Sequence, residues 1–115
     1  MNSEQLDFTM EFTNKVSNMA EELQLKLYDE AYDRLSRLRG DHNDLTGAAV
    51  RLEELVPGRD PRLFEARVVV YIRPENIAAT EKDDVPLAAL KSALTAVERQ
   101  VREKRKRLRE HYKQP

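Results

Sequence analysis

Apolar residues recur in this chain with two different periods, and the order of those periods restricts the fold more than any other sequence feature. Apolar and polar residues alternate over residues 6–12, which is typical of a strand with one buried face. Over residues 19–38 the apolar residues recur every three or four positions, which predicts a helix that ends at about Arg39. Alternation returns over residues 48–53 and, most clearly, over residues 64–73. The chain is therefore expected to begin as strand, helix, strand, strand.

Short polar segments separate these elements. Asn18 is followed three residues later by Glu21, a spacing that resembles a capping box at the start of the first helix, and Gly40 is expected to end that helix. Residues 57–61, Pro-Gly-Arg-Asp-Pro, have the length of a hairpin loop. The two strands on either side of this loop are therefore expected to pair antiparallel.

The last part of the chain is expected to hold a short strand and a long helix. Residues 77–80 form the short strand, and residues 81–84, Glu-Lys-Asp-Asp, are expected to form a polar turn. Asp84 is expected to cap the last helix, with Pro86 in its first turn, where a missing backbone N–H costs little. Apolar residues then follow at three- and four-residue spacing from Leu87 to Tyr112, which predicts a helix that is packed along its length.

The order strand, helix, three strands, helix predicts an α+β two-layer sandwich, β-α-β-β-β-α. Its four-stranded sheet should carry both helices packed on one face. The 115 residues have a mass of 13.4 kDa, which fits a single domain, 1–115, with its core over about residues 6–112. Hydrophobic residues make up 40% of the chain, which is enough to build such a core.

Several classes of protein are excluded by what the sequence lacks. A membrane span needs about 20 consecutive apolar residues, and no segment of the sequence offers them, so no membrane partner is expected. The N-terminus lacks the basic and apolar regions of a signal peptide, so the expected location is cytoplasmic. The chain has no Cys, which excludes a disulfide framework and a thiolate metal site.

Charge is distributed very unevenly along the chain. Lys and Arg number 20 and Asp and Glu 21, which gives a formal net charge of -1. Residues 99–113 nevertheless hold eight basic residues and two acidic ones, so this segment carries a net charge of +6 and the remainder carries -7. Such asymmetry points to a polyanionic partner at one end of the molecule. The alternative is a helix whose charges are merely solvated.

Helical periodicity gathers the basic residues of the last helix into a ridge beside the buried stripe. At about 100° per residue, the members of this ridge fall within roughly 80° of arc; they are Lys91, Arg99, Arg102, Lys106, Arg109 and Lys113. Arg105 and Arg107 project to either side of it, while Glu98 and Glu110 lie near enough to neutralise part of it. These cations are predicted to contact RNA phosphates, although cations at a helix C-terminus also complement the helix dipole.

Two further groups of residues are lesser candidates for RNA contact. Lys26 and Arg37 lie eleven residues apart on one flank of the first helix. Arg67, Tyr71 and Arg73 alternate along the third strand and could form a stacking surface on an open sheet face, which is equally typical of an ordinary solvated face.

Several short segments in the second half of the chain match the pattern of a known family. These are Ile77-Ala78-Ala79-Thr80, then Asp84-Val85-Pro86-Leu87-Ala88-Ala89-Leu90, and then Val97-Glu98-Arg99-Gln100-Val101-Arg102, with an alternating basic pattern at Arg105, Arg107 and Arg109. In these segments the chain resembles a short-form ribosome hibernation promoting factor, also called ribosome-associated translation inhibitor, of the sigma-54 modulation protein family. It departs from the family pattern at Pro86, Lys91 and Glu103.

The resemblance implies a translation inhibitor that acts by occlusion and not by catalysis. Its partner would be the 16S rRNA of the small ribosomal subunit, and it would occupy the channel of messenger and transfer RNA. The resemblance also implies a role in stress response, stationary phase and ribosome hibernation. The family's long forms carry a C-terminal dimerisation domain that pairs ribosomes; none is expected within these 115 residues.

The sequence also bears on three other functions: an enzyme, a protein-interaction module and a general RNA-binding domain. His42 and His111 are the only histidines and have no metal-ligand spacing, and no Gly-rich phosphate loop occurs, so no enzyme, cofactor, metal site or small-molecule substrate is expected. A protein-interaction module is one alternative, because the acidic first helix carries Tyr28 and Tyr32. A general RNA-binding domain is another. The oligomeric state stays open, with a monomer as one option.

Overall fold

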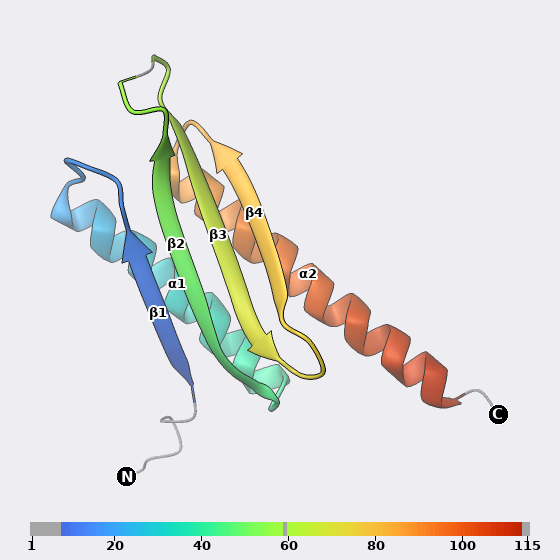
Figure 1. Ribbon diagram of the computed structural model, residues 1–115. Helices are drawn as coiled ribbons and strands as arrows, with labels where there is room; N and C mark the ends of the chain where they lie inside the picture. Colours follow the sequence, from blue (N-terminus) through green and yellow to red (C-terminus); the bar gives the residue numbers. More distant parts are fainter. Residues whose placement is uncertain (1–7, 59, 114–115) are drawn as a thin grey trace, which may run out of the picture.

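The computed structural model describes the backbone of residues 8–58 and 60–113 and the side chains of these segments up to residue 110. Its elements follow the predicted order. They are β1 (Thr9–Asn14), α1 (Glu21–Asp41), β2 (Leu45–Leu55), β3 (Leu63–Ile72), β4 (Ile77–Asp83) and α2 (Pro86–Lys113). Both helices lie on the same side of the sheet (Figure 1). The predicted α+β sandwich is therefore confirmed.

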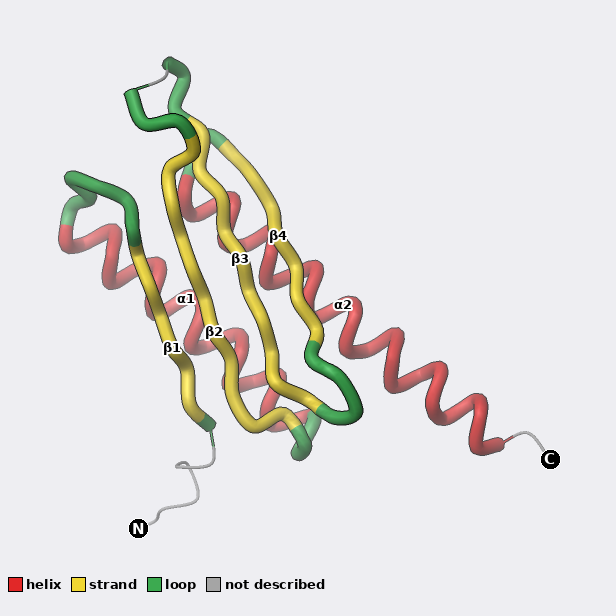
Figure 2. Tube along the Cα trace, viewed as in Figure 1, coloured by secondary structure: helices red, strands yellow, loops and turns green. Residues whose placement is uncertain are grey.

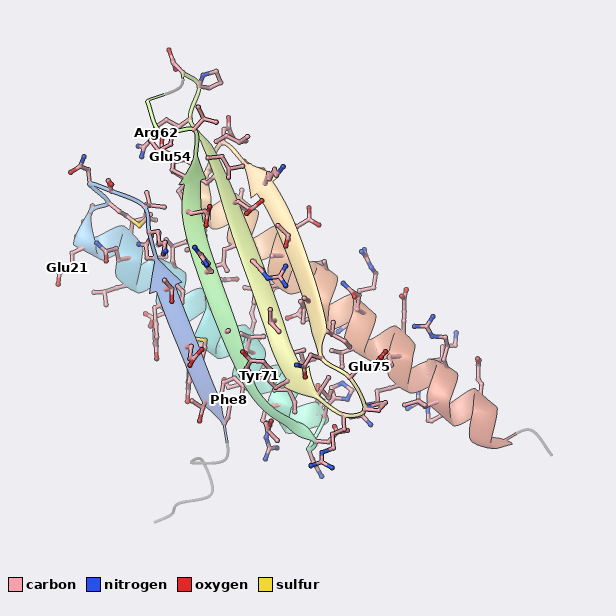
Figure 3. The ribbon with its side chains drawn as sticks, viewed as in Figure 1. Phe8, Glu21, Glu54, Arg62, Tyr71 and Glu75 are labelled. Atoms are coloured by element: carbon pink, nitrogen blue, oxygen red, sulfur yellow. The ribbon has the colours of Figure 1, made fainter. Side chains whose placement is uncertain are left out.

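The four strands form one sheet in the order β1-β2-β3-β4. β1 runs parallel to β2, because α1 carries the chain back across the sheet between them, while β2, β3 and β4 are antiparallel neighbours. The predicted hairpin of β2 and β3 is thus confirmed, with Val50 opposite Val68. At its loop end Arg62 donates hydrogen bonds to both carboxylate oxygens of Glu54, at 2.8 and 2.9 Å (Figure 3).

The core lies between the sheet and the helices. Alternate residues of β3, from Phe64 to Ile72, are buried, and so are Val50 and Leu52 of β2. The helices close this layer with aliphatic side chains, namely Leu27, Ala31, Leu35 and Leu38 of α1 and Leu90, Leu94, Val97 and Val101 of α2. No element of the described chain covers the opposite face of the sheet (Figure 2).

The segment at residues 81–84 was expected to be a turn, and that expectation is wrong. β4 continues to Asp83, because Glu81 pairs with Ala66 and Lys82 pairs with Glu65 of β3. Backbone pairing with a long neighbouring strand thus overrides the local polar composition. The residue before α2 is Val85, so Asp84 is not its N-cap; the carboxylate of Asp83 accepts a hydrogen bond from the backbone N–H of Val85 at 3.1 Å.

The predicted capping box of α1 is also wrong. The N-cap residue is Ala20, which makes no side-chain capping hydrogen bond, and Asn18 has a positive φ of 58° in the preceding turn. That backbone conformation, which Asn tolerates better than most residues, removes Asn18 from the capping position. At the other end, Gly40 lies inside the helix, which continues to Asp41.

The C-terminal part of α2 extends past the end of the sheet (Figure 1). A helix of 28 residues is about 42 Å long, whereas the ten residues of β3 span about 34 Å. Val101 is the last buried residue of the helix among those whose side chains are described. The basic segment that follows it therefore projects beyond the core, and the prediction that this helix is packed along its whole length is wrong for residues 102–110.

Candidate nucleic-acid interface

The basic ridge predicted on α2 is exposed in the structure. The ridge residues whose side chains are described are Lys91, Arg99, Arg102, Lys106 and Arg109, and all five are exposed. The side chain of Lys113 lies outside the described part. The buried stripe of Leu90, Leu94, Val97 and Val101, which lies beside the ridge, holds the helix against the sheet. The amphipathic pattern of α2 therefore fixes which side of the helix presents these cations.

Glu98 does not neutralise the ridge as expected, because Arg34 of α1 binds its carboxylate. The guanidinium donates two hydrogen bonds, from Nη2 to one carboxylate oxygen at 2.7 Å and from Nε to the other at 3.0 Å. Nη2 also donates to the hydroxyl of Thr95 at 2.9 Å. Both charged side chains are only about one-fifth exposed, at 19% and 18%. The pair joins the two helices and satisfies the Glu98 carboxylate, whereas Glu110, the other acid beside the ridge, is exposed.

The surroundings of Arg34 keep it charged. The hydrogen bond to Glu98 raises the pKa of Arg34 above its ordinary value, against the opposing effect of burial, and Glu30 adds to the increase. Glu30 lies one turn earlier in α1, 3.6 Å from the guanidinium. The role of Arg34 is not predictable from the sequence, because only its spacing from Glu30 is visible there and its partner on α2 is 64 residues away.

Two ion pairs hold α2 where it leaves the core. Arg105 pairs with Asp44 in the turn between α1 and β2, and Lys104 pairs with Glu75 in the turn between β3 and β4, with 3.3 Å between Nζ and Oε1. Figure 3 shows Glu75 beside this part of the helix. The hydrogen bond from Arg105 holds the pKa of the Asp44 carboxyl below its ordinary value. The helix is therefore anchored on both sides before its basic end projects.

The remaining candidates for RNA contact differ in exposure and in whether they form ion pairs within the fold. Arg105 is half-buried in its ion pair, so its charge is partly satisfied within the fold. Arg107 is exposed, near the turn that holds Glu75. Lys26 and Arg37 are exposed on α1, and helical periodicity places both on the flank that also carries Arg34. Because Arg34 faces α2, these two cations border the same side of the helix pair as the ridge.

The open face of the sheet carries charges of both signs. Arg51 and Arg67 are direct neighbours across β2 and β3, and Glu53 and Glu65 are neighbours in the next pair. Arg51 forms an ion pair with Glu53 at 3.2 Å, and Arg67 donates to the hydroxyl of Thr80 at 3.2 Å. These cations already have partners on the sheet. The face therefore has the features of an ordinary solvated surface.

The aromatic residues considered for stacking or protein contact have defined places in the fold. Tyr71 is 38% exposed on the open face, and Arg73 is exposed just beyond β3. On α1, Tyr28 and Tyr32 stack with their ring centroids 6.1 Å apart and contact Phe12 and Phe8 edge-on at 5.5 and 6.0 Å. The two tyrosines thus pack α1 against the edge of the sheet.

The histidine and acidic side chains of the described part of the chain do not converge on a metal site. Within residues 8–58 and 60–113, no group of three or more His, Cys, Asp or Glu side chains could hold a metal ion. His42 lies in the turn after α1, where burial and then the charge of Arg105 lower its pKa. Among the helices so described, none is long and apolar enough to cross a membrane.

Comparisons with known proteins give one family match and two structures of similar fold. Residues 2–109 match the family described as sigma 54 modulation protein / S30EA ribosomal protein. No curated protein matches the sequence. A ribosomal subunit interface protein from Coxiella burnetii is 11% identical, with a TM-score of 0.63 over 84% of this chain and 97% of that chain. The N-terminal domain of Protein Y from Thermus thermophilus is 17% identical, with a TM-score of 0.54 over 79% and 93%. At these identities the two structures show a likeness of fold alone.

Proposed function

The chain belongs to the sigma-54 modulation protein / S30EA ribosomal protein family of non-catalytic, ribosome-associated factors, and from that membership we propose that it binds the small ribosomal subunit. Its ligand there is 16S rRNA, and its effect is to block the channel that messenger and transfer RNA occupy. It thereby inhibits translation and keeps ribosomes inactive, as in stress or stationary phase. Its place of action is the cytoplasm, where ribosomes are.

The observation that carries the proposal is the exposed ridge on α2. Its cations lie on one side of a helix that projects beyond the core, and the carboxylate of Glu98, one of the two acids beside the ridge, is held by Arg34. Unpaired Arg and Lys side chains at helical spacing can contact several phosphates at once. Such contacts supply affinity and position the domain without reading the sequence of the RNA.

Occlusion requires a rigid body and no reaction. The packed sheet and helices supply the bulk that excludes other ligands, and the ion pairs of Arg105 and Lys104 join the start of the projecting segment to two turns of the domain. The domain then competes with messenger RNA because both occupy the same channel, which is lined by rRNA phosphates. A single domain of this size is sufficient for that action.

Co-sedimentation with purified small subunits at several salt concentrations tests the proposal. Each phosphate contact adds about 0.7 to 0.9 to the slope of log affinity against log salt, so a ridge with several contacts gives steep salt dependence. The double charge reversal Arg102→Glu with Lys106→Glu is expected to abolish binding and leave the thermal unfolding temperature almost unchanged, because both side chains are exposed. Normal binding by this variant would contradict the ridge hypothesis.

A matched control makes the same change of charge on the open face of the sheet. Arg51→Glu with Lys82→Glu alters two exposed cations that lie outside the ridge and outside the other candidates for RNA contact. This variant is expected to sediment with small subunits as the unaltered protein does. Equal loss of binding in both variants would show that net charge alone, and not the ridge, controls the affinity.

A general RNA-binding domain is the second candidate, because the ridge contacts phosphates in any RNA. Free single-stranded RNA added in excess distinguishes the two functions. If it displaces the protein from small subunits at an equal concentration of nucleotides, the binding is general. If displacement needs a large excess, the ribosomal site is preferred.

A further inference from the structure

A hollow opens where the turn after α1 meets the projecting part of α2. Its volume is about 540 Å³, within the range of about 300 to 1,000 Å³ typical of sites for small organic groups. One wall is the turn at residues 41–44, and the other wall consists of Arg105, Leu108 and Arg109. The proposed function does not use this hollow, although Arg109 belongs both to its wall and to the ridge.

The wall of the hollow offers surfaces that suit a flat ring. The side chain of Leu108 is half-buried and apolar, and the imidazole of His42 is half-buried beside it in the same hollow. Burial, and then the charge of Arg105, lower the pKa of His42 below its ordinary value, which favours the neutral imidazole. The guanidinium of Arg105 is held in place by Asp44. Imidazole rings and guanidinium planes are the groups on which unpaired RNA bases stack.

The polar groups at the mouth of the hollow favour some bases over others. Asp44 is engaged by Arg105, whereas Asp41 and Asn43 are exposed. A free carboxylate accepts hydrogen bonds from the amino group of cytosine. The carbonyl oxygen that uracil carries at the same position would instead face a negative charge. The carboxylate of Asp41 therefore favours bases with an exocyclic amino group over uracil, whereas the amide of Asn43 can pair with either.

We propose that this hollow binds one unstacked base of single-stranded RNA that carries an exocyclic amino group, while Arg109 contacts the adjoining phosphate. The proposal rests on the proposed RNA binding by the ridge and adds base preference to it. The ridge supplies affinity that does not depend on sequence, and the hollow selects which unpaired nucleotide sits beside the end of α2.

Two oligonucleotides of equal length test the proposal. Octamers of cytidylate and of uridylate carry the same phosphates, so the ridge contributes equally to the binding of both. One well-placed base contact changes the affinity by about fivefold or more, so the cytidylate octamer is expected to bind at least that much more tightly in fluorescence anisotropy. Asp41→Asn should remove the preference for cytidylate over uridylate, because the amide lacks the negative charge and can also donate a hydrogen bond to uracil. The slope of log affinity against log salt should stay unchanged, because the ridge is unaltered.

The outcomes separate the hollow from the ridge. Equal affinity for both octamers, with strong salt dependence, would contradict base binding in the hollow and would still support phosphate binding by the ridge. Failure of both octamers to bind overturns the two together. Arg102→Glu with Lys106→Glu should weaken both octamers alike and preserve their ratio. A ratio that changes with this ridge variant, but not with Asp41→Asn, would place the base preference outside the hollow.

A direct measurement locates the base on the protein. Cytidine and uridine 5′-monophosphates are titrated separately into isotopically labelled protein, and backbone amide shifts are followed by NMR. Cytidine monophosphate is expected to shift the amides of His42, Asn43 and Leu108 at lower concentration than uridine monophosphate does. Shifts confined to the open face of the sheet, around Tyr71, would overturn the proposal.

Discussion

Replacing Arg34 with Met, which keeps much of the side-chain volume, is predicted to destabilise the domain and to weaken RNA binding without removing any ridge residue. The guanidinium makes two hydrogen bonds to Glu98, at 2.7 and 3.0 Å, and one to Thr95 at 2.9 Å. Hydrogen bonds to charged groups contribute about 1.5 to 3 kcal/mol each. Because both charged side chains are still about one-fifth exposed, we expect a coupling free energy of about 1 to 2 kcal/mol between them.

A double-mutant cycle with Arg34→Met, Glu98→Gln and the double variant measures this coupling by chemical denaturation. For a chain of 115 residues, each 1 kcal/mol corresponds to a shift of about 4 °C in the unfolding temperature. The single variants should therefore lose several degrees. A coupling free energy below about 0.3 kcal/mol would show that the ion pair does not hold the helices together.

The same cycle tests the electrostatic role of the pair in RNA binding. Arg34→Met leaves the Glu98 carboxylate unpaired beside the ridge, and a unit charge at about 10 Å from a phosphate in water-like surroundings costs about 0.4 kcal/mol, or roughly twofold in affinity per phosphate. Adding Glu98→Gln removes that carboxylate and should restore binding. If the double variant stays as weak as Arg34→Met, Arg34 itself contacts the RNA and the reasoning is refuted.

Three further predictions follow from individual side chains. A Cβ at position 47 would lie 2.8 Å from the carbonyl oxygen of Thr9, so Gly47→Ala should push β1 from β2 and lower the free energy of unfolding by about 1 to 3 kcal/mol in urea titrations. The pKa of His42 is lowered in the fold, so stability should fall as the pH drops below its ordinary value of 6.5, and His42→Gln should abolish that part of the pH dependence. Arg105 lowers the pKa of Asp44 in the folded state. The stability that the Asp44 carboxylate contributes is therefore present above about pH 4 and is lost as the pH falls towards the folded pKa. Asp44→Asn should remove this loss of stability from acid titrations followed by circular dichroism.

The order of the elements was predictable because each long element carries its own period of apolar residues. The alternation from Phe64 to Ile72 and the stripe from Leu90 to Val101 are properties of single segments, and the structure buries both. The ends of elements depend on partners elsewhere in the chain. Glu81 and Lys82 look like turn residues in isolation, yet β3 continues far enough to pair with them. Local composition cannot reveal such a neighbour.

The ridge was predictable for the same reason, since helical spacing alone decides which cations share a side of α2. The residues that position the ridge were not predictable. Arg34 reaches Glu98, Arg105 reaches Asp44 and Lys104 reaches Glu75 across 64, 61 and 29 residues of sequence. Each of these pairs exists only because α1 and α2 pack side by side and the two turns meet the same part of α2. No spacing rule connects their partners in the sequence.

The acidic charge of the rest of the chain helps to orient the molecule relative to a polyanion. Residues outside 99–113 carry a net charge of -7. On the outer side of α1 the exposed acids Glu22, Asp29 and Asp33 outnumber the exposed cations Lys26 and Arg37. A polyanion repels that surface while it attracts the end of α2, so the charge distribution orients the molecule before contact and favours approach by one end. A uniformly basic domain of the same size would bind RNA in many orientations. Opposed charges on a rigid domain therefore favour one pose at a site lined with phosphates, which is what a factor that acts by occlusion requires.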